Sequence, residues 1–228
     1  DILVHRLGRN DFFLCVNASN QEKDFDWIAS RNRFDAQAEL TSERYVQLAI
    51  QGPQALATLS KLTDAQLDSI AYYHFTRGEV LGVEALIART GYTGEDGCEI
   101  YVPPEDGPRL WEAVLDAGAE FGIIPCGLGA RNTLRLEAAM SLYGHEIDDT
   151  ITPYEARLGW IVKPDQGNFI GREALISQKE KGVERRLAGF EMRGRGIARD
   201  GYRVFVDGED VGWVTSGSPA PFLEKNIG

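Results

Sequence analysis

A glycine-rich segment in the middle of the chain constrains the fold more than any other feature. Residues 91–97 contain three glycines and lie between two short apolar segments, 81–88 and 98–102. Glycine at this density permits backbone conformations that other residues avoid, and it is typical of a connection between strands. We therefore predict two strands joined by a stiff loop that carries Tyr92 and Glu95.

A carboxylate on such a loop suits a planar hydrogen-bond donor. Glu95 can accept two parallel hydrogen bonds from an N–C–N donor edge of the kind that a pterin ring offers. Tyr92 can stack on the same ring or border it. From composition alone, however, the segment is also an ordinary hairpin turn, so the loop by itself leaves both interpretations open.

Short strands and short helices alternate along the rest of the chain. The pattern predicts a β-hairpin within 2–16, a helix over 21–31 that a Ser19–Glu22 capping box would begin, and a helix over 130–139. Further segments are expected as strands at 45–50, 81–88 and 98–102, and as helices at 54–62 and 104–118. This pattern favours an α+β protein with a largely antiparallel sheet.

The C-terminal part has a different character. Residues 179–182 look like a linker, and short strands with frequent turns follow from Leu187 onward. The Asp207-Gly208 pair is a hairpin signal. We predict that this part is the start of an all-β domain.

Composition excludes several classes of protein. The chain has 228 residues, a formal net charge of -11 and 43% hydrophobic residues, as in ordinary globular proteins. A uniformly basic surface for nucleic acid is therefore not expected. No apolar run approaches the ~20 residues that span a bilayer.

One basic cluster stands against this acidic background, and glutamates interrupt it. Its members are Lys179, Lys181, Arg185, Arg186, Arg193, Arg195 and Arg199. A solvated face or linker is one interpretation, and a patch that binds an anion or a partner is the other.

Cysteine and histidine usage argues against a metal site and a disulfide framework. The cysteines, Cys15, Cys98 and Cys126, are odd in number and lie far apart. No CxxC pair or paired histidine spacing occurs. A reducing compartment is therefore expected, with no metal.

A second informative segment spans 125–138. Its Gly127-Leu128-Gly129 lacks the third glycine of a dinucleotide site, because Asn132 stands there. Arg131 falls in the first turn of the predicted helix, where the macrodipole opposes a cation. The residue is therefore a candidate for binding an external anion, although an exposed arginine without a role fits equally well.

These two segments belong to an ordered set that resembles a known family. The others are VNA at 16–18, IQGP at 50–53, LYGHEIDDTITP at 142–153, FIGREAL at 169–175 and VTSGSPAP at 214–221. The set resembles the T-protein (aminomethyltransferase) family of the glycine cleavage system and covers essentially the whole chain. It departs at Asp149, where the family more often has glutamate.

The resemblance implies a multi-domain, folate-binding aminomethyltransferase-like fold of the α+β class. It suggests one discontinuous folate-binding unit over 1–42 and 146–180, a second over 43–145, and the start of a C-terminal β-barrel domain over 185–228. It also implies that this chain is the middle of a longer protein and lacks both termini.

The resemblance further implies a reaction and a set of residues. The one-carbon unit of aminomethyl-dihydrolipoyl H-protein passes to the co-substrate tetrahydrofolate, and ammonia is released. Asp1 would be catalytic, and Glu95, Arg131, Asn17 and Tyr92 would bind folate. No metal, nucleic acid or membrane is implied, and the location would be the cytoplasm, or the mitochondrial matrix in a eukaryote.

Two alternatives remain from the same superfamily. One is a folate-dependent demethylase that acts on an N-methyl or S-methyl donor without H-protein. The other is a folate-binding protein without enzymatic activity, a branch that carries a cysteine-containing motif in place of the Arg89–Glu95 segment.

Overall fold

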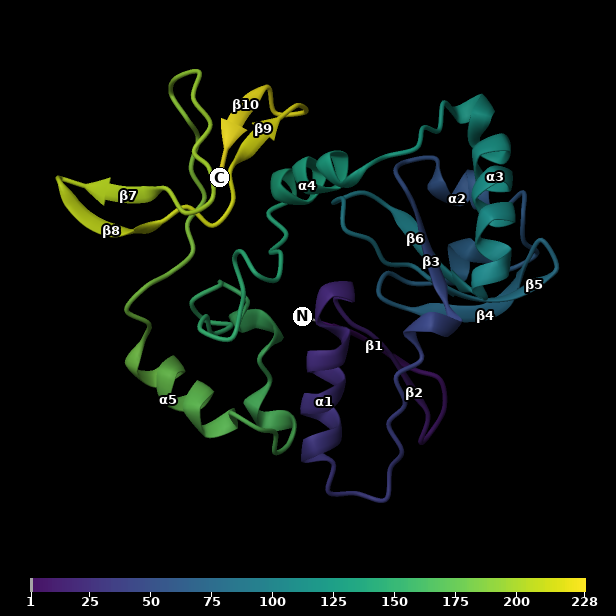
Figure 1. Cartoon of the computed structure of the whole chain (residues 1–228), viewed down its shortest axis with the longest axis horizontal. Coiled ribbons are helices and arrows are strands. Elements are labelled where there is room, and N and C mark those ends of the chain that lie inside the picture. Colours follow the sequence, from purple (N-terminus) through teal and green to yellow (C-terminus); the bar gives the residue numbers. More distant parts are fainter. Residues whose placement is uncertain (1) are drawn as a thin grey trace. The chain divides into compact units, whose positions relative to one another are not determined.

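The computed structural model describes residues 2–228, so Asp1 lies outside the described residues. The chain divides into two compact units, Asp1–Gly127 and Leu128–Gly228. Each unit mixes helices and strands, which confirms the α+β class (Figure 1). The finer division into 1–42 with 146–180, 43–145 and 185–228 stays a prediction.

A four-stranded antiparallel sheet organises the first unit. It consists of β3 (Val46–Gln51), β4 (Phe75–Val80), β5 (Val83–Ala88) and β6 (Gly97–Val102), in the order β3-β6-β5-β4. The expected antiparallel pairing is confirmed, and the glycine-rich loop joins β5 to β6. Strand β4 was not expected, because its sequence FTRGEV contains a glycine and lacks regular alternation.

Helices α2 (Ala55–Leu59) and α3 (Gly107–Gly118) pack against one face of this sheet (Figure 1). Leu110 and Val114, one turn apart on α3, are buried there as their helical spacing predicted. The buried apolar cluster consists of Ile50, Ala55, Leu59, Leu67, Ile70, Val80, Ala85, Ile87, Cys98, Ile100, Val102, Leu110 and Val114. The first unit therefore has a conventional hydrophobic core.

The hairpin of β1 (Leu3–Arg6) and β2 (Phe12–Cys15) contacts the opposite face of the sheet. The His5 and Phe13 rings pack edge-on against Tyr101 of β6, at centroid distances of 5.8 and 5.3 Å. Tyr101 alternates along β6 with Ile100, which belongs to the apolar cluster. The sheet therefore has one aliphatic face and one aromatic face.

Helix α1 (Gln21–Arg31) has the bounds that its sequence predicted, but it begins differently. Asn20 precedes its first turn without a side-chain capping bond, and Ser19 lies in a 3₁₀ turn over Ala18–Asn20. The predicted capping box is therefore wrong. The serine is already part of a turn and is not the residue that opens the helix.

The second unit has two α-helices and two small sheets among the described residues. Helix α4 (Leu128–Glu137) packs against β9 (Ser218–Ala220), which pairs with β10 (Lys225–Ile227). The other sheet pairs β7 (Arg203–Val206) with β8 (Glu209–Trp213). Asp207 and Gly208 join β7 to β8 with φ of 53° and 86°, so the predicted hairpin is confirmed.

Helix α5 (Arg172–Lys181) corrects the expected linker at 179–182. Lysines at its end face the negative pole of the helix dipole, and Gly182, with φ of 85°, ends it. The remaining short 3₁₀ helices are Ser42–Arg44, Leu67–Ser69, Pro104–Asp106, Ala119–Phe121, Gly159–Ile161 and Pro164–Gln166.

Candidate functional site

A bidentate ion pair closes the glycine-rich loop at its base. Arg89 donates from Nε to Asp96 Oδ1 at 3.0 Å and from Nη2 to Asp96 Oδ2 at 2.7 Å, and its Nη1 donates to the Ile70 carbonyl at 2.9 Å. These hydrogen bonds lower the pKa of Asp96 and raise the pKa of Arg89. The two ends of the loop are therefore held together over residues 90–95.

Gln51 fills the inside of the loop and explains two of its glycines. Its Nε2 donates to the carbonyls of Thr90 at 3.1 Å and Cys98 at 3.4 Å. A Cβ on Gly91 would lie 1.8 Å from Gln51 Oε1, and one on Gly97 would lie 2.5 Å from a main-chain oxygen. A side chain at Gly97 would meet the Ile50 carbonyl, and one at Gly91 would displace the Gln51 amide from the loop. The two glycines therefore let the loop pack closely around Gln51.

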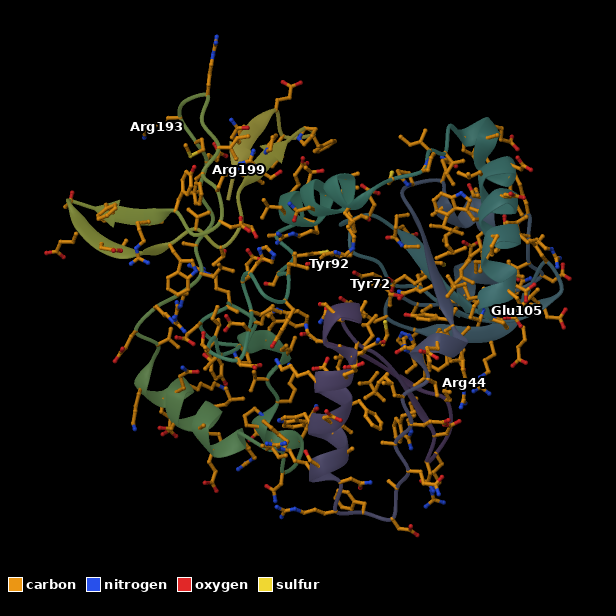
Figure 2. The ribbon with its side chains drawn as sticks, viewed as in Figure 1. Arg44, Tyr72, Tyr92, Glu105, Arg193 and Arg199 are labelled. Atoms are coloured by element: carbon orange, nitrogen blue, oxygen red, sulfur yellow. The ribbon has the colours of Figure 1, made fainter. Side chains whose placement is uncertain are left out.

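The two predicted ligand residues of this loop differ in exposure. Glu95 is exposed, and among residues 2–228 its carboxylate has no hydrogen-bond or ion-pair partner; only its amide is held, by Thr93 Oγ1 at 3.3 Å. Tyr92 is half-buried (Figure 2). A rigid backbone thus presents an exposed carboxylate three residues from an aromatic ring.

A second carboxylate, Glu99, lies at the start of β6 and was not singled out from the sequence. It is half-buried, and it accepts hydrogen bonds from Gln47 Nε2 at 2.8 Å and from the hydroxyl of buried Thr90. Strand alternation places it on the aromatic face, between the core residues Cys98 and Ile100. That alternation was the signal that the sequence offered.

Polar atoms with few or no partners lie beside Glu99 on the aromatic face. Among residues 2–228, His5 Nδ1 is buried and has no hydrogen-bond partner, and the buried Tyr101 hydroxyl interacts with no polar group other than the Cys15 thiol. Burial lowers the pKa of His5 and raises the pKa of Tyr101, so both groups are neutral near pH 7. Cys15 lies on the same face and donates to Gln47 Oε1 at 3.7 Å; burial raises the pKa of its thiol. This face therefore combines aromatic rings with unused hydrogen-bonding capacity.

Two exposed tyrosines flank the loop and were also missed. The Tyr72 and Tyr73 rings meet edge to face at 4.4 Å, and the Tyr73 amide donates to the Arg89 carbonyl at 3.0 Å. Tyr73 has a φ of 62°, which is unusual for a residue with a side chain. Exposed aromatic rings beside a loop that carries a carboxylate, here Glu95, are suited to binding a flat heterocycle.

The remaining predicted residues fall in both units. Asn17, half-buried, follows β2 in the first unit. Arg131, exposed, is on α4 in the second unit. Asn17, Tyr92 and Glu95 therefore belong to one compact unit, and Arg131 to the other.

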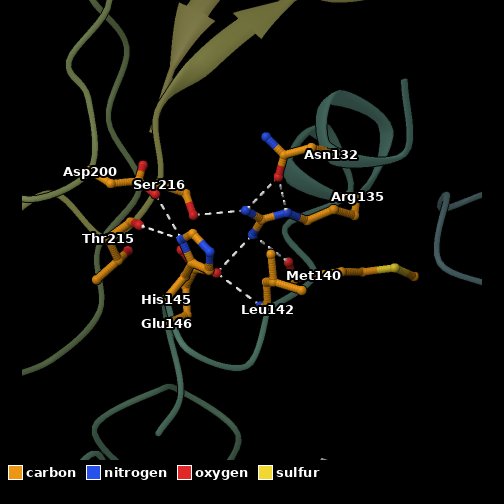
Figure 3. A network of polar contacts seen from close by, with 9 residues as sticks. All are labelled: Asn132, Arg135, Met140, Leu142, His145, Glu146, Asp200, Thr215 and Ser216. Atoms are coloured by element: carbon orange, nitrogen blue, oxygen red, sulfur yellow. Dashed lines mark hydrogen bonds and ion pairs between the residues drawn. The ribbon is translucent and has the colours of Figure 1, made fainter. Parts of the chain in front are cut away.

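One turn after Arg131, Arg135 is at the centre of a buried polar network (Figure 3). Its side chain is 1% exposed and pairs at 2.7 Å with Glu146, whose side chain is 6% exposed. The guanidinium also donates twice to Asn132 Oδ1, and to the Met140 carbonyl and the Ser216 hydroxyl at 3.1 and 2.7 Å. All five N–H groups of the guanidinium therefore have acceptors, which a buried arginine requires.

The environment of Glu146 favours its charged form. Burial alone would raise its pKa, but the Ser216 and Thr215 hydroxyls, the Leu142 amide and the charge of Arg135 together lower it. The neighbouring His145 contacts Asp200 Oδ2 at 2.7 Å and the Thr215 carbonyl at 3.2 Å. The LYGHE and VTSG segments are thus tied together inside the second unit.

The second unit also contains a cavity of about 490 Å³. Phe190, Tyr202, Trp213 and Val214 are among its lining residues. Arg185 lies at this wall, paired with Glu155 at 2.7 Å and placed 5.5 Å from the centroid of the Trp213 ring. The lining of the cavity is mainly apolar and includes the Arg185–Glu155 ion pair.

Neither a metal-binding cluster nor a membrane-spanning helix is present among the described residues. Residues 2–228 contain no cluster of His, Cys, Asp and Glu placed to hold a metal ion. None of the helices in that range is long and apolar enough to cross a membrane.

Comparison with known proteins defines the class of protein. Residues 1–166 match the family described as "GCVT N-terminal domain", and residues 185–228 match the "Glycine cleavage T-protein C-terminal barrel domain". The chain therefore belongs to the glycine cleavage T-protein family. This confirms the resemblance and the expected start of a C-terminal barrel domain.

Individual relatives are consistent with this family assignment. The chain is 54% identical over 228 residues to "Aminomethyltransferase" of Desulfitobacterium hafniense and 52% identical over 230 residues to that of Geobacillus kaustophilus. All of this chain is covered, but only 62% and 63% of those relatives. The crystal structure of glycine cleavage system aminomethyltransferase T from Bartonella henselae matches with a TM-score of 0.89 and 32% identity, over 100% of this chain and 62% of that one. The chain thus spans somewhat less than two thirds of the length of these proteins.

Proposed function

We propose that this chain is part of an aminomethyltransferase of glycine cleavage. The reaction takes aminomethyl-dihydrolipoyl H-protein and tetrahydrofolate to 5,10-methylenetetrahydrofolate, ammonia and dihydrolipoyl H-protein. The observation that carries the proposal is the 54% identity, over the whole chain, to a curated protein named for this activity. The demethylase and the non-enzymatic folate binder are not favoured, because the relatives reported above bear the aminomethyltransferase name.

The residues of the first unit fit a reduced pterin. Its N–C–N edge needs a carboxylate acceptor, which the glycine-rich loop offers in Glu95, and its ring needs a flat neighbour, which Tyr92 offers. The exposed rings of Tyr72 and Tyr73 lie beside the same loop. Asn17 is proposed as a further residue of the pocket.

Glu99 is a second candidate for the carboxylate that binds the pterin edge. Its orientation is fixed in advance by Gln47 and Thr90, whereas no side chain holds the Glu95 carboxylate among residues 2–228. Fixing a ligand group before binding reduces the entropy lost on binding. The same two donors occupy part of the acceptor capacity of Glu99, so only substitution of each glutamate in turn decides between them.

Asp1 and Arg131 are proposed for the reacting centre and the folate tail. During transfer, N5 of the folate attacks the one-carbon unit and acquires positive charge, which a nearby carboxylate such as Asp1 would stabilise. Arg131 would bind a carboxylate or carbonyl of the folate, because an exposed cation near a helix N-terminus gains from an external anion.

The proposed setting follows from the same reaction. Lipoylated H-protein is the protein partner, with no role for nucleic acid or a membrane. The location is the cytoplasm, or the mitochondrial matrix in a eukaryote. The folate-binding units are proposed to be 1–42 with 146–180, and 43–145, followed by the barrel domain from 185.

A turnover assay tests this function. Ammonia and 5,10-methylenetetrahydrofolate are measured from aminomethylated H-protein and tetrahydrofolate, and product is expected only when both substrates are present. Asp1→Asn is expected to lower turnover far more than folate affinity. Turnover of a methyl donor in the absence of H-protein would overturn the assignment.

A further inference from the structure

Three arginines of the basic cluster lie together on one exposed loop. Residues 192–200, here called the arginine loop, carry Arg193, Arg195 and Arg199, all of them exposed. Figure 2 labels Arg193 and Arg199. Among residues 2–228, none of the three forms an ion pair. Arg185, by contrast, forms an ion pair with Glu155. Arg185 is the one member of the cluster that forms an ion pair among residues 2–228, and what distinguishes the three arginines is that a single loop carries them.

The acidic residues that border the arginine loop do not neutralise it. Glu191, directly before the loop, pairs with Lys225 at 2.7 Å. Asp200, the last residue of the loop, contacts His145 at the same distance. Neither carboxylate forms an ion pair with an arginine of the loop, so the three guanidinium groups have no ion-pair partner among residues 2–228, in a protein whose formal net charge is -11.

The arginine loop is anchored at both ends. The Met192 amide donates to the Asn226 carbonyl at 2.8 Å, and Asn226 Nδ2 donates to the Gly196 carbonyl at 3.1 Å. After the loop, the Gly201 amide donates to the Val214 carbonyl at 2.8 Å. The main chain at Ala198 packs closely on Gly217: a Cβ on Gly217 would lie 1.6 Å from the Ala198 carbonyl oxygen. The backbone that carries the arginines is thus fixed before any partner arrives.

We propose that the arginine loop is a docking surface for an acidic protein face. Under the proposed function, on which this identification of the partner rests, that face belongs to the H-protein. Arginine suits the role because its planar guanidinium binds carboxylates through two hydrogen bonds. Charge at the rim of an interface chiefly raises the association rate and selects the partner.

A protein partner fits better than nucleic acid. A polyanion would extend beyond the loop and meet the acidic remainder of the chain, whose repulsion acts over about 10 Å at ordinary salt. A folded acidic domain can present a few carboxylates to the loop alone. The residues between the arginines, Gly194 and Gly196-Ile197-Ala198, also include no aromatic ring on which a base could stack.

The test compares two triple variants of equal charge change. The first, Arg193→Glu/Arg195→Glu/Arg199→Glu, reverses the arginine loop. The matched control, Arg9→Glu/Arg33→Glu/Arg77→Glu, reverses three exposed arginines of the first unit that form no ion pair among residues 2–228. The Kd for immobilised lipoylated H-protein is measured at about 0.05 M and about 0.3 M NaCl. Tetrahydrofolate binding by each protein serves as a separate check of folding and of the proposed function.

The loop variant is expected to bind H-protein at least about tenfold more weakly than the control at low salt, with the difference shrinking at high salt. The milder Arg193→Gln/Arg195→Gln/Arg199→Gln variant is expected to fall between them. Equal Kd values for loop and control variants, or no H-protein binding by the unsubstituted chain, would overturn the docking surface. So would tighter binding of a single-stranded oligonucleotide than of H-protein. Loss of folate binding by the unsubstituted chain would instead count against the proposed function.

Discussion

The two compact units of this chain are stabilised by different means. Thirteen buried apolar residues form the cluster of the first unit, on one face of a four-stranded sheet. In the second unit the buried apolar residues are only Ala156, Val214 and Ala220 among those described, and a buried arginine–glutamate pair lies beside buried serines. Apolar burial is gradual and tolerant of substitution, whereas a buried charge depends on every partner being present.

The difference bears on how each unit supports function. The first unit is a stiff platform, and its packed sheet fixes the loop that carries Tyr92 and Glu95. In the second unit the polar network ties α4, which carries Arg131, to the LYGHE and VTSG segments. We expect the second unit to respond more strongly to substitution and to pH.

The largest effect is expected from Arg135→Ala. This change leaves the Glu146 carboxylate buried without its cation, and it should lower the free energy of unfolding of the second unit by about 4 kcal/mol. Urea denaturation, followed by hydrogen exchange in each unit, measures the change. The double variant Arg135→Met/Glu146→Leu should cost less, because it removes both charges. A loss below about 1 kcal/mol for the single variant would contradict the role of the network.

The matching test in the first unit is Ile100→Ala. Ile100 is fully buried at the centre of the sheet, so the cavity should cost about 3 kcal/mol, confined to the first unit. Hydrogen exchange over β3, β5 and β6 measures this local effect. Equal loss of protection in both units would show that they do not unfold separately.

Acid should destabilise the second unit first. The pKa of Glu146 is lowered on folding from its ordinary value of 4.5, so its stabilising effect is present above that pH. The effect is lost as the pH falls through the lower, folded pKa. Hydrogen exchange and chemical denaturation at a series of pH values below 4.5 should show this loss, and Glu146→Gln should flatten the profile. A first unit that unfolds at higher pH than the second would refute the comparison.

The smallest effect is expected from an exposed pair of the second unit. Arg203 and Asp210 form a bidentate pair at 2.6–2.9 Å, but their side chains are 53% and 41% exposed. Arg203→Ala should therefore change the free energy of unfolding by less than about 1 kcal/mol. Thermal denaturation of Arg203→Ala and of Arg135→Ala compares the loss of an exposed ion pair with the loss of a buried one. The comparison shows whether burial or charge alone determines the loss of stability. A loss as large as that of Arg135→Ala would show that burial is not the deciding factor.

Local sequence patterns predicted much of the fold. The helix over 21–31, the hairpin at Asp207-Gly208 and the buried Leu110 and Val114 follow from spacing and turn chemistry. Strand β4 was not predicted, because its irregular sequence is stabilised as a strand by pairing with β5, which local patterns do not reveal. Lys179 and Lys181 suggested a linker because their favourable place at a helix end is visible only once the helix is known.

The candidate site was predictable in its loop but not in its surroundings. Three glycines marked the loop, whereas Gln51, which packs against two of them, lies about 40 residues earlier in the chain, a separation that local patterns do not bridge. The partners of Arg135 are equally distant, since Ser216 reaches it from another segment. Glu99 was overlooked although strand alternation alone sets it apart from its core neighbours.

A folate site at the glycine-rich loop is tested by calorimetric titration of the chain with tetrahydrofolate under reducing conditions. Glu95→Ala and Glu99→Ala are compared with Glu105→Ala, an exposed glutamate of the same unit that serves as the matched control. We expect saturable binding that Glu105→Ala retains and that Glu95→Ala abolishes, or that Glu99→Ala abolishes if the strand carboxylate is the ligand. Equal affinity in all four proteins would contradict a folate site at this loop.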